Sequence, residues 1–238
     1  RDRYKESIMH ISIDDVKGVF NALSKESMNS IFDTRTLRFL KDMHIKYGTT
    51  FDLYCTYSKE GYSLADISDK YQKEFKDNAD WLRFGFHCYS ENEDRGKQQF
   101  ITDIDLFLKD LKRITGQTKM SQYLRIHRFL GDFEYCKTLK EKGVSHLLTA
   151  DDERNSYYLG KTETEILEKN GYWSDKETGI KFIKSAFRLE NVDNVYEKIR
   201  ECSSKNYPVI AVFTHEWLMD SIEIRNKMEV CCKYSNQF

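Results

Sequence analysis

Two acidic residues and several histidines stand where apolar runs of the sequence end. Asp14 and Asp15 follow the apolar, β-branched run 8–13, and His87 and His215 end later apolar runs. Carboxylates and imidazoles bind divalent transition metals, and they also act as general bases and acids near neutral pH. This combination of residue types indicates metal-assisted hydrolysis.

The adjacent carboxylates Asp14 and Asp15 can have different functions, because side chains alternate along a strand. One of them can bind a metal ion while the other accepts a proton from water whose pKa the metal lowers. The alternative is structural, with the two residues capping the helix that follows.

His87 and His215 each have a carboxylate nearby in the sequence. Glu91 follows His87 by four residues, so one turn can supply two ligands to a cation. His215 is followed by Glu216, and the ordinary pKa of histidine makes it a candidate general acid. In the alternative, His87 caps a polar loop and His215 begins a helix, with Glu216 facing the helix dipole.

Short apolar runs alternate with amphipathic segments along the whole chain, which predicts strands alternating with helices. The expected strands are 8–13, 49–56, 82–87, 123–127, 144–149 and 209–214, with a hairpin over 171–191 whose second arm is 182–189. The expected helices are 29–47, one that starts at Ser63, 95–115, 133–142, 162–169, 195–202 and 216–233.

This alternation implies parallel strands joined by right-handed crossovers. We therefore expect an α/β fold, a distorted or incomplete (β/α) barrel of about seven strands. In such barrels the functional side chains collect at the carboxyl ends of the strands, which is where the acidic and histidine residues fall. No glycine-rich phosphate loop follows any expected strand, which argues against a nucleotide-binding sheet.

The composition limits the partners and the setting. A formal net charge of -1 over 238 residues gives no reason to expect a nucleic-acid partner, and no apolar run is long enough to span a membrane. The six cysteines form no C-x-x-C pair, so we expect them to be buried in a reducing compartment rather than to hold zinc. We expect a cytoplasmic protein with one domain over 1–238.

Four segments resemble the motifs of polysaccharide deacetylases, in the same order and over nearly the whole chain. Segment 11–16 is similar to the family's T-F-D-D-G motif, and segment 85–91 to G-x-H-[ST]-x-S-H. Segment 124–129 resembles the R-x-P motif, and segment 213–215 falls where an apolar strand ending in L-H belongs.

The resemblance implies a role for each matching residue. Asp14 would be the catalytic base, Asp15 and His87 would be metal ligands, His215 would be the general acid, and Arg125 would orient the base. The implied reaction is the hydrolysis of an N-acetyl group on a sugar by a divalent metal ion, of which zinc is the first expectation and Mn, Co, Ni or Fe are alternatives.

The sequence departs from the family pattern at the third metal ligand. Glu91 stands where the family has its second metal histidine, and His127 is the other candidate for that position. Val16 replaces the glycine of the first motif. The set is most similar to divergent members from bacterial surface-polysaccharide gene clusters, so a carbohydrate or a sugar nucleotide is the expected substrate.

Two other functions fit the same residues. The chain could hydrolyse another amide or an ester with the same metal, or it could be a barrel with a degraded site that only binds a glycan. In the second case Tyr54, Tyr57, Tyr62 and Tyr89, near the expected strand ends, could stack on sugar rings. The alternative for these tyrosines is a place in the core or at its rim.

Overall fold

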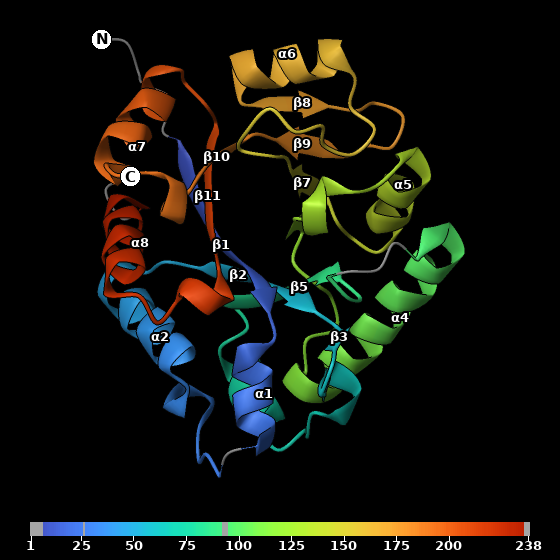
Figure 1. Ribbon diagram of the computed structural model, residues 1–238, viewed down its shortest axis with the longest axis vertical. Coiled ribbons are helices and arrows are strands. Elements are labelled where there is room, and N and C mark those ends of the chain that lie inside the picture. The colour runs from blue at the N-terminus through green and yellow to red at the C-terminus, as the bar shows by residue number, and fades with distance from the viewer. Residues whose placement is uncertain (1–6, 26, 92–94, 236–238) are drawn as a thin grey trace.

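The protein has an α/β architecture in which parallel strands surround a buried interior and helices cover the outside (Figure 1). The computed structural model describes residues 7–25, 27–91 and 95–235. The strands are β1 (Ile8–Val16), β2 (Phe51–Thr56), β3 (Ser58–Lys59), β4 (Tyr62–Ser63), β5 (Leu82–Cys88), β6 (Tyr123–Leu124), β7 (His146–Leu148), β8 (Tyr172–Ser174), β9 (Lys181–Ile183), β10 (Ser185–Arg188) and β11 (Val209–His215).

The helices alternate with these strands along the chain. The α-helices are α1 (Gly18–Lys25), α2 (Arg35–Tyr47), α3 (Gln72–Asp77), α4 (Gly96–Thr115), α5 (Phe133–Glu141), α6 (Lys161–Asn170), α7 (Val195–Ser204) and α8 (Ile222–Ser235). Short 3-10 turns are η1 (Ile31–Asp33), η2 (Leu64–Asp66), η3 (His127–Phe129), η4 (Leu189–Asn191) and η5 (Glu216–Leu218).

The strands form three sheets, two of which together make a distorted barrel, while the third is the antiparallel pair of β3 and β4. The central sheet has five strands in the order β10-β11-β1-β2-β5, all paired in parallel. A second sheet, in the order β6-β7-β9-β8, begins beside β5, where the backbone N–H of Ser121 donates to the carbonyl of Phe84 at 2.8 Å. In this sheet only β8 runs antiparallel. The predicted α/β class and incomplete barrel are confirmed.

The barrel is interrupted twice in the part of the chain that the structure describes. Neither the junction of β5 with β6 nor that of β9 with β10 forms a strand ladder. The predicted second arm of the hairpin, 182–189, divides at Lys184 into β9 and β10, which belong to different sheets. The five strands of the central sheet and β6, β7 and β9 of the second make a ring of eight, with β8 at the outer edge, where the sequence predicted about seven.

The amphipathic helices bury the faces that their periodicity predicts. In α4, Phe100, Ile104, Phe107, Leu111 and Ile114 are all buried against the barrel. Gly116, in the left-handed conformation, ends this helix. Side chains from both sheets and their helices form one connected hydrophobic cluster.

Several predicted boundaries are wrong, and α1 was not predicted. The helix predicted from residue 29 begins at Arg35, after the turn η1. Ser63 caps the short turn η2 instead of a helix, because its hydroxyl accepts only from the N–H of Ala65 and α3 begins nine residues later. The predicted strand 123–127 stops at Leu124, where the chain turns into η3. The last helix starts at Ile222 rather than at Glu216, which lies in η5.

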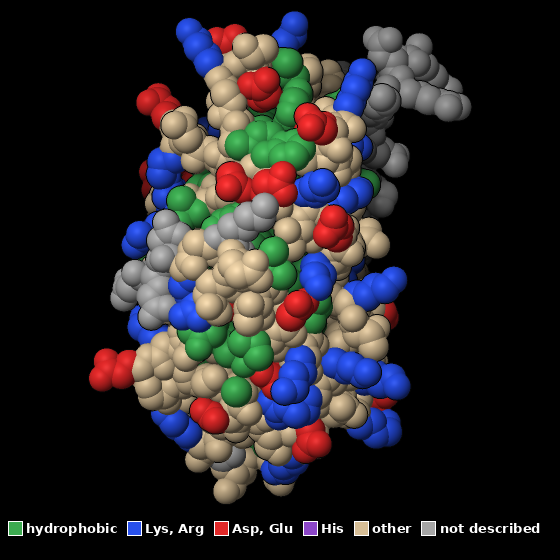
Figure 2. Space-filling model, turned by 90° about the vertical axis from the view of Figure 1, so that its right-hand side faces the viewer, with side chains coloured by type: hydrophobic (Ala, Val, Ile, Leu, Met, Phe, Trp, Pro, Cys, Tyr) green, Lys and Arg blue, Asp and Glu red, His purple; other side chains and the backbone are tan. Residues whose placement is uncertain are grey.

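The surface carries charges of both signs. On the face that bears α4 and α5, lysine and arginine side chains are interspersed with aspartate and glutamate (Figure 2). Within the described residues, no helix combines the length and the apolar character that crossing a membrane requires.

Candidate metal centre and active site

The end of β1 contains a bulge that separates the functions of its two carboxylates. The register of β1 against β2 shifts between Ile13 and Val16, and Asp15 has a left-handed φ of 57°. A bulge re-aims the side chains that follow it, and such strained residues concentrate at functional sites. Asp14 and Asp15 therefore face different partners although they are adjacent.

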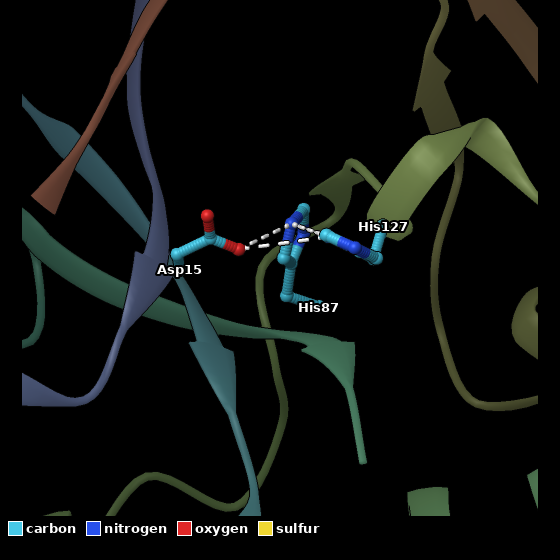
Figure 3. A group of neighbouring side chains, drawn as sticks. All are labelled: Asp15, His87 and His127. Carbon is cyan, nitrogen blue, oxygen red and sulfur yellow. Dashed lines mark hydrogen bonds and ion pairs between the residues drawn. The ribbon is translucent and has the colours of Figure 1, made fainter. Parts of the chain in front are cut away.

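Asp15, His87 and His127 bring three ligand atoms together at the carboxyl ends of β1 and β5 and in η3. Asp15 Oδ1 lies 3.3 Å from His87 Nε2 and 3.6 Å from His127 Nδ1, and the two nitrogens are 3.3 Å apart. Figure 3 shows the three side chains pointing toward one another from separate elements. This is a group of one carboxylate and two imidazoles, a donor set suited to zinc and similar transition metals.

The spacing and the hydrogen bonds of this group fit a bound cation. A point equidistant from the three atoms lies about 2.0 Å from each, within the roughly 2.0–2.2 Å that zinc keeps to nitrogen and oxygen ligands. His87 Nδ1 lies 2.7 Å from the carbonyl of Arg125, which can only accept, so Nδ1 carries the proton and Nε2 presents its lone pair to the group. Asp15 Oδ1 is buried without a hydrogen-bond partner.

The charges in the group reinforce one another. Burial raises the pKa of Asp15, but the imidazoles of His127 and His87 outweigh it and hold that pKa well below its ordinary value. Burial lowers the pKa of His87, and the negative charges of Asp14 and Asp15 outweigh this and raise it. The same negative charges favour a cation bound at Nε2. Asp15 is thus an anion, as a metal ligand must be.

Asp14 is buried beside Arg125, on the other side of the bulge. Arg125 Nη1 donates to Asp14 Oδ1 at 2.9 Å, and both side chains are almost wholly buried. Ser12 and Ser185 hydroxyls accept from the same guanidinium at 2.9 and 3.1 Å. Arg125 is therefore fixed inside the barrel by three polar contacts, and it fixes one oxygen of Asp14.

His215 lies next to Asp14, because the two residues are direct partners in the ladder between β1 and β11. Its Nδ1 is 2.6 Å from Glu190 Oε1 in η4. Burial lowers the pKa of His215, but the hydrogen bond to Glu190 and the charge of Asp14 outweigh it and raise the pKa above its ordinary value. A histidine in this state holds its proton near neutral pH.

Comparison with solved structures identifies the fold. Over 97% of this chain, the structure superposes on a putative polysaccharide deacetylase from Mycobacterium smegmatis with a TM-score of 0.56 and 9% identity, covering 86% of that protein. Over 98% of the chain it matches a 4-alpha-glucanotransferase from Thermococcus litoralis with a TM-score of 0.59 and 11% identity, covering 41% of that protein. The chain therefore shares its fold with both the polysaccharide deacetylase and the glucanotransferase.

The fold-level resemblance predicted from the four motifs is thereby confirmed. No family model matches the sequence, and no curated protein matches it significantly. At 9–11% identity the likeness establishes the arrangement of strands and helices, and the roles of individual residues depend on the geometry of this chain.

Within this deacetylase-type fold, Glu91 is not part of the three-residue group. It accepts hydrogen bonds from the ammonium groups of Lys17 and, at 2.7 Å, of Lys59. Burial raises the pKa of Glu91, and these two hydrogen bonds outweigh it and lower the pKa. His127, the other candidate of the sequence, occupies the third corner of the group instead.

Glu216 does not pair with His215 either. Its carboxylate accepts hydrogen bonds from the backbone N–H groups of Lys17, Gly18 and Val19, at 2.8, 2.5 and 2.8 Å. It therefore binds the amino-terminal end of α1, where a helix dipole favours an anion.

Sequence reasoning missed Glu190 and the two serines that hold Arg125. A signal for Glu190 exists, since it follows β10 as closely as His87 and His215 follow their apolar runs. Ser12 and Ser185 carry no such signal, because a serine inside a strand has no distinctive spacing. Their contacts appear only once β1 and β10 face the interior together.

Proposed function

We propose that this chain is a metal-dependent hydrolase that removes an N-acetyl or similar acyl group from a carbohydrate. The observation that carries this proposal is the group of Asp15, His87 and His127 beside Asp14 and His215 at one end of the barrel. The likeness of fold to a putative polysaccharide deacetylase supports a carbohydrate as the substrate.

Asp15, His87 and His127 would hold the cation, with zinc as the first candidate. Three protein ligands leave further coordination positions open, as in catalytic rather than structural zinc sites. A divalent cation held there polarises a carbonyl oxygen and lowers the pKa of water.

The remaining residues divide the proton transfers between them. Asp14 would accept the proton of the attacking water, while Arg125 holds its other oxygen and so orients it. His215 would donate its proton to the leaving nitrogen, because Glu190 keeps the imidazole charged. The two residues are partners on adjacent strands, so both can reach one bound amide.

Metal content and turnover of five variants test the proposal. The metal content of purified, zinc-loaded protein is measured by mass spectrometry, and acetate release is followed from N-acetylated oligosaccharides. Asp15→Ala, His87→Ala and His127→Ala are expected to lose the metal, and Glu91→Gln is expected to keep it. Asp14→Asn keeps the metal but lowers kcat by about 10²–10⁴-fold, as loss of a general base does.

Contrary results are clearly distinguishable. If His127→Ala retains the metal and Glu91→Gln loses it, the third ligand is Glu91 instead of His127. Turnover that yields a different acid, or an alcohol from an ester, would keep the site and change the bond cleaved. Full metal occupancy without any turnover would favour the alternative function, a barrel that binds a glycan without hydrolysing it.

A further inference from the structure

Trp217 is a large aromatic side chain that stands open to solvent beside the proposed general acid. It is 70% exposed, whereas Trp81 is buried in the core. Its indole stacks on the ring of His215, with centroids 5.8 Å apart and planes inclined by 28°. At this separation the two rings are offset, and most of the indole surface remains open to the solvent.

Two of the four tyrosines that the sequence offered as sugar-stacking residues are unsuited to that role. Tyr54 and Tyr57 are buried in the core, and the Tyr57 hydroxyl is bound to Asp110 at 2.7 Å. Neither ring can present a face to a ligand. Trp217 has the free aromatic surface that these residues lack.

Trp217 lines the same groove as Asp15, one of the three proposed metal ligands. The groove has a volume of about 640 Å³, and its lining also includes Lys17, Arg35, Thr36 and Asp220. Sites of roughly 300–1,000 Å³ hold ligands of several rings, which is far more than an acetyl group needs. The groove can thus hold sugar residues beyond the one that reacts.

The charges of the groove favour a neutral, hydroxylated ligand. Acidic residues outnumber basic ones in its lining, with Asp15, Asp33, Glu216 and Asp220 against Lys17 and Arg35. Both cations already have acidic neighbours, since Lys17 binds Glu91 and Arg35 lies 3.8 Å from Asp220. With the proposed divalent cation at Asp15, the four acidic and two basic side chains leave the groove without net formal charge, so the lining has no excess of positive charge to hold a diphosphate. Sugar hydroxyls can donate to its carboxylates and accept from its cations.

We propose that Trp217 is the stacking platform for a pyranose ring next to the reacting sugar, and that the substrate is a neutral oligosaccharide rather than a sugar nucleotide. The apolar C–H face of a pyranose covers the open face of the indole, and its hydroxyls reach the charged rim. This inference rests on the proposed function only in defining which sugar of the ligand reacts. Binding itself is measured without turnover.

Binding of metal-loaded protein to an array of neutral oligosaccharides and to a uridine diphosphate sugar tests the proposal. Wild type is expected to bind at least one oligosaccharide of three or more sugars. Trp217→Ala weakens this binding about tenfold, while Trp217→Phe, which keeps an aromatic face, stays within about threefold. Tyr196→Ala, which removes another exposed aromatic ring on α7, is the matched control and binds as wild type.

Asp14→Asn separates this inference from the proposed function, because it is expected to bind the oligosaccharide as wild type does without hydrolysing it. Oligosaccharide binding that Trp217→Ala leaves unchanged would overturn the inference. So would a wild-type protein that binds no oligosaccharide, or one that binds the uridine diphosphate sugar more tightly. If Trp217→Ala changes only the pH profile of kcat, the indole serves His215 and not the substrate.

Discussion

Glu190 controls the protonation state of His215. The groups that face this imidazole are Glu190 from η4, Asp14 and Asp15 from β1, and the ring of Trp217. Removing the charge of Glu190 lowers the raised pKa of His215. Since the general acid acts in its protonated form, activity is lost as pH rises through that pKa. Glu190→Gln therefore moves the alkaline limb of the kcat profile to lower pH.

Kinetics over a range of pH with a fixed, saturating substrate measure this shift. Thr214→Val is the matched control, because the Thr214 hydroxyl donates to the other oxygen of Glu190 at 3.0 Å and its loss leaves the charge in place. The control is expected to keep the wild-type limb. An alkaline limb that stays in place in Glu190→Gln would mean that His215 does not donate the proton.

Single residues also show where sequence reasoning succeeds. Asp14, Asp15, His87 and His215 could be found because each follows an apolar run, and barrel geometry collects such positions at one end. The third corner of the group could not be assigned between Glu91 and His127. That choice depends on Lys17 and Lys59, which neutralise Glu91, and the sequence does not show that these lysines lie near it.

Among the elements, η5 and α1 are joined by one carboxylate. Glu216 accepts from three backbone N–H groups at the start of α1, which would otherwise lack partners within the helix. Glu216→Ala is expected to lower the free energy of unfolding by about 2 kcal/mol, since it removes both the hydrogen bonds and the charge at the helix end. Urea denaturation at constant pH measures this loss.

Glu163 provides the comparison, because its carboxylate accepts a single backbone hydrogen bond, from Gly160 at 3.0 Å, at the start of α6. Glu163→Ala should cost about 0.5–1 kcal/mol. Equal losses in the two alanine variants would show that a carboxylate accepting three hydrogen bonds stabilises the fold no more than one accepting a single hydrogen bond.

The elements themselves differ in how well the sequence predicts them. The long helix α4 was predicted to within one residue and the end of α2 was predicted correctly, because their apolar side chains repeat at helical spacing and a glycine follows each. The start of α2 was predicted six residues too early, because the turn η1 precedes it. The short strands β6 and β7 were predicted too long, since two or three paired residues leave no periodic signal. Their extent is set by the neighbouring strand and by the left-handed Arg128 and Phe129 that follow β6.

Across the whole molecule, the proposed metal site spans the break between the two sheets. Asp15 and His87 belong to β1 and β5 of the central sheet, whereas His127 lies in η3, just after β6 of the second sheet. No strand ladder joins β5 to β6 in the described part of the chain. A cation held by all three side chains would therefore link the sheets where backbone pairing does not.

This arrangement predicts that zinc stabilises the fold and does so unevenly. At a free concentration a thousand times the Kd, zinc adds about 4 kcal/mol, which corresponds to a rise in Tm of roughly 10 °C for a chain of this length. Amide hydrogen exchange should slow most at residues 125–130, which hold His127, and least in β8 at the outer edge of the second sheet.

Thermal unfolding and hydrogen exchange, each with zinc and with a chelator, measure the two effects. His127→Ala, which is expected to lose the metal, should abolish the local slowing at residues 125–130. Glu91→Gln should respond to zinc as wild type does, because Glu91 lies outside the three-residue group. Protection that rises equally in β8 and at residues 125–130 would show that the cation stabilises the protein without joining its two sheets.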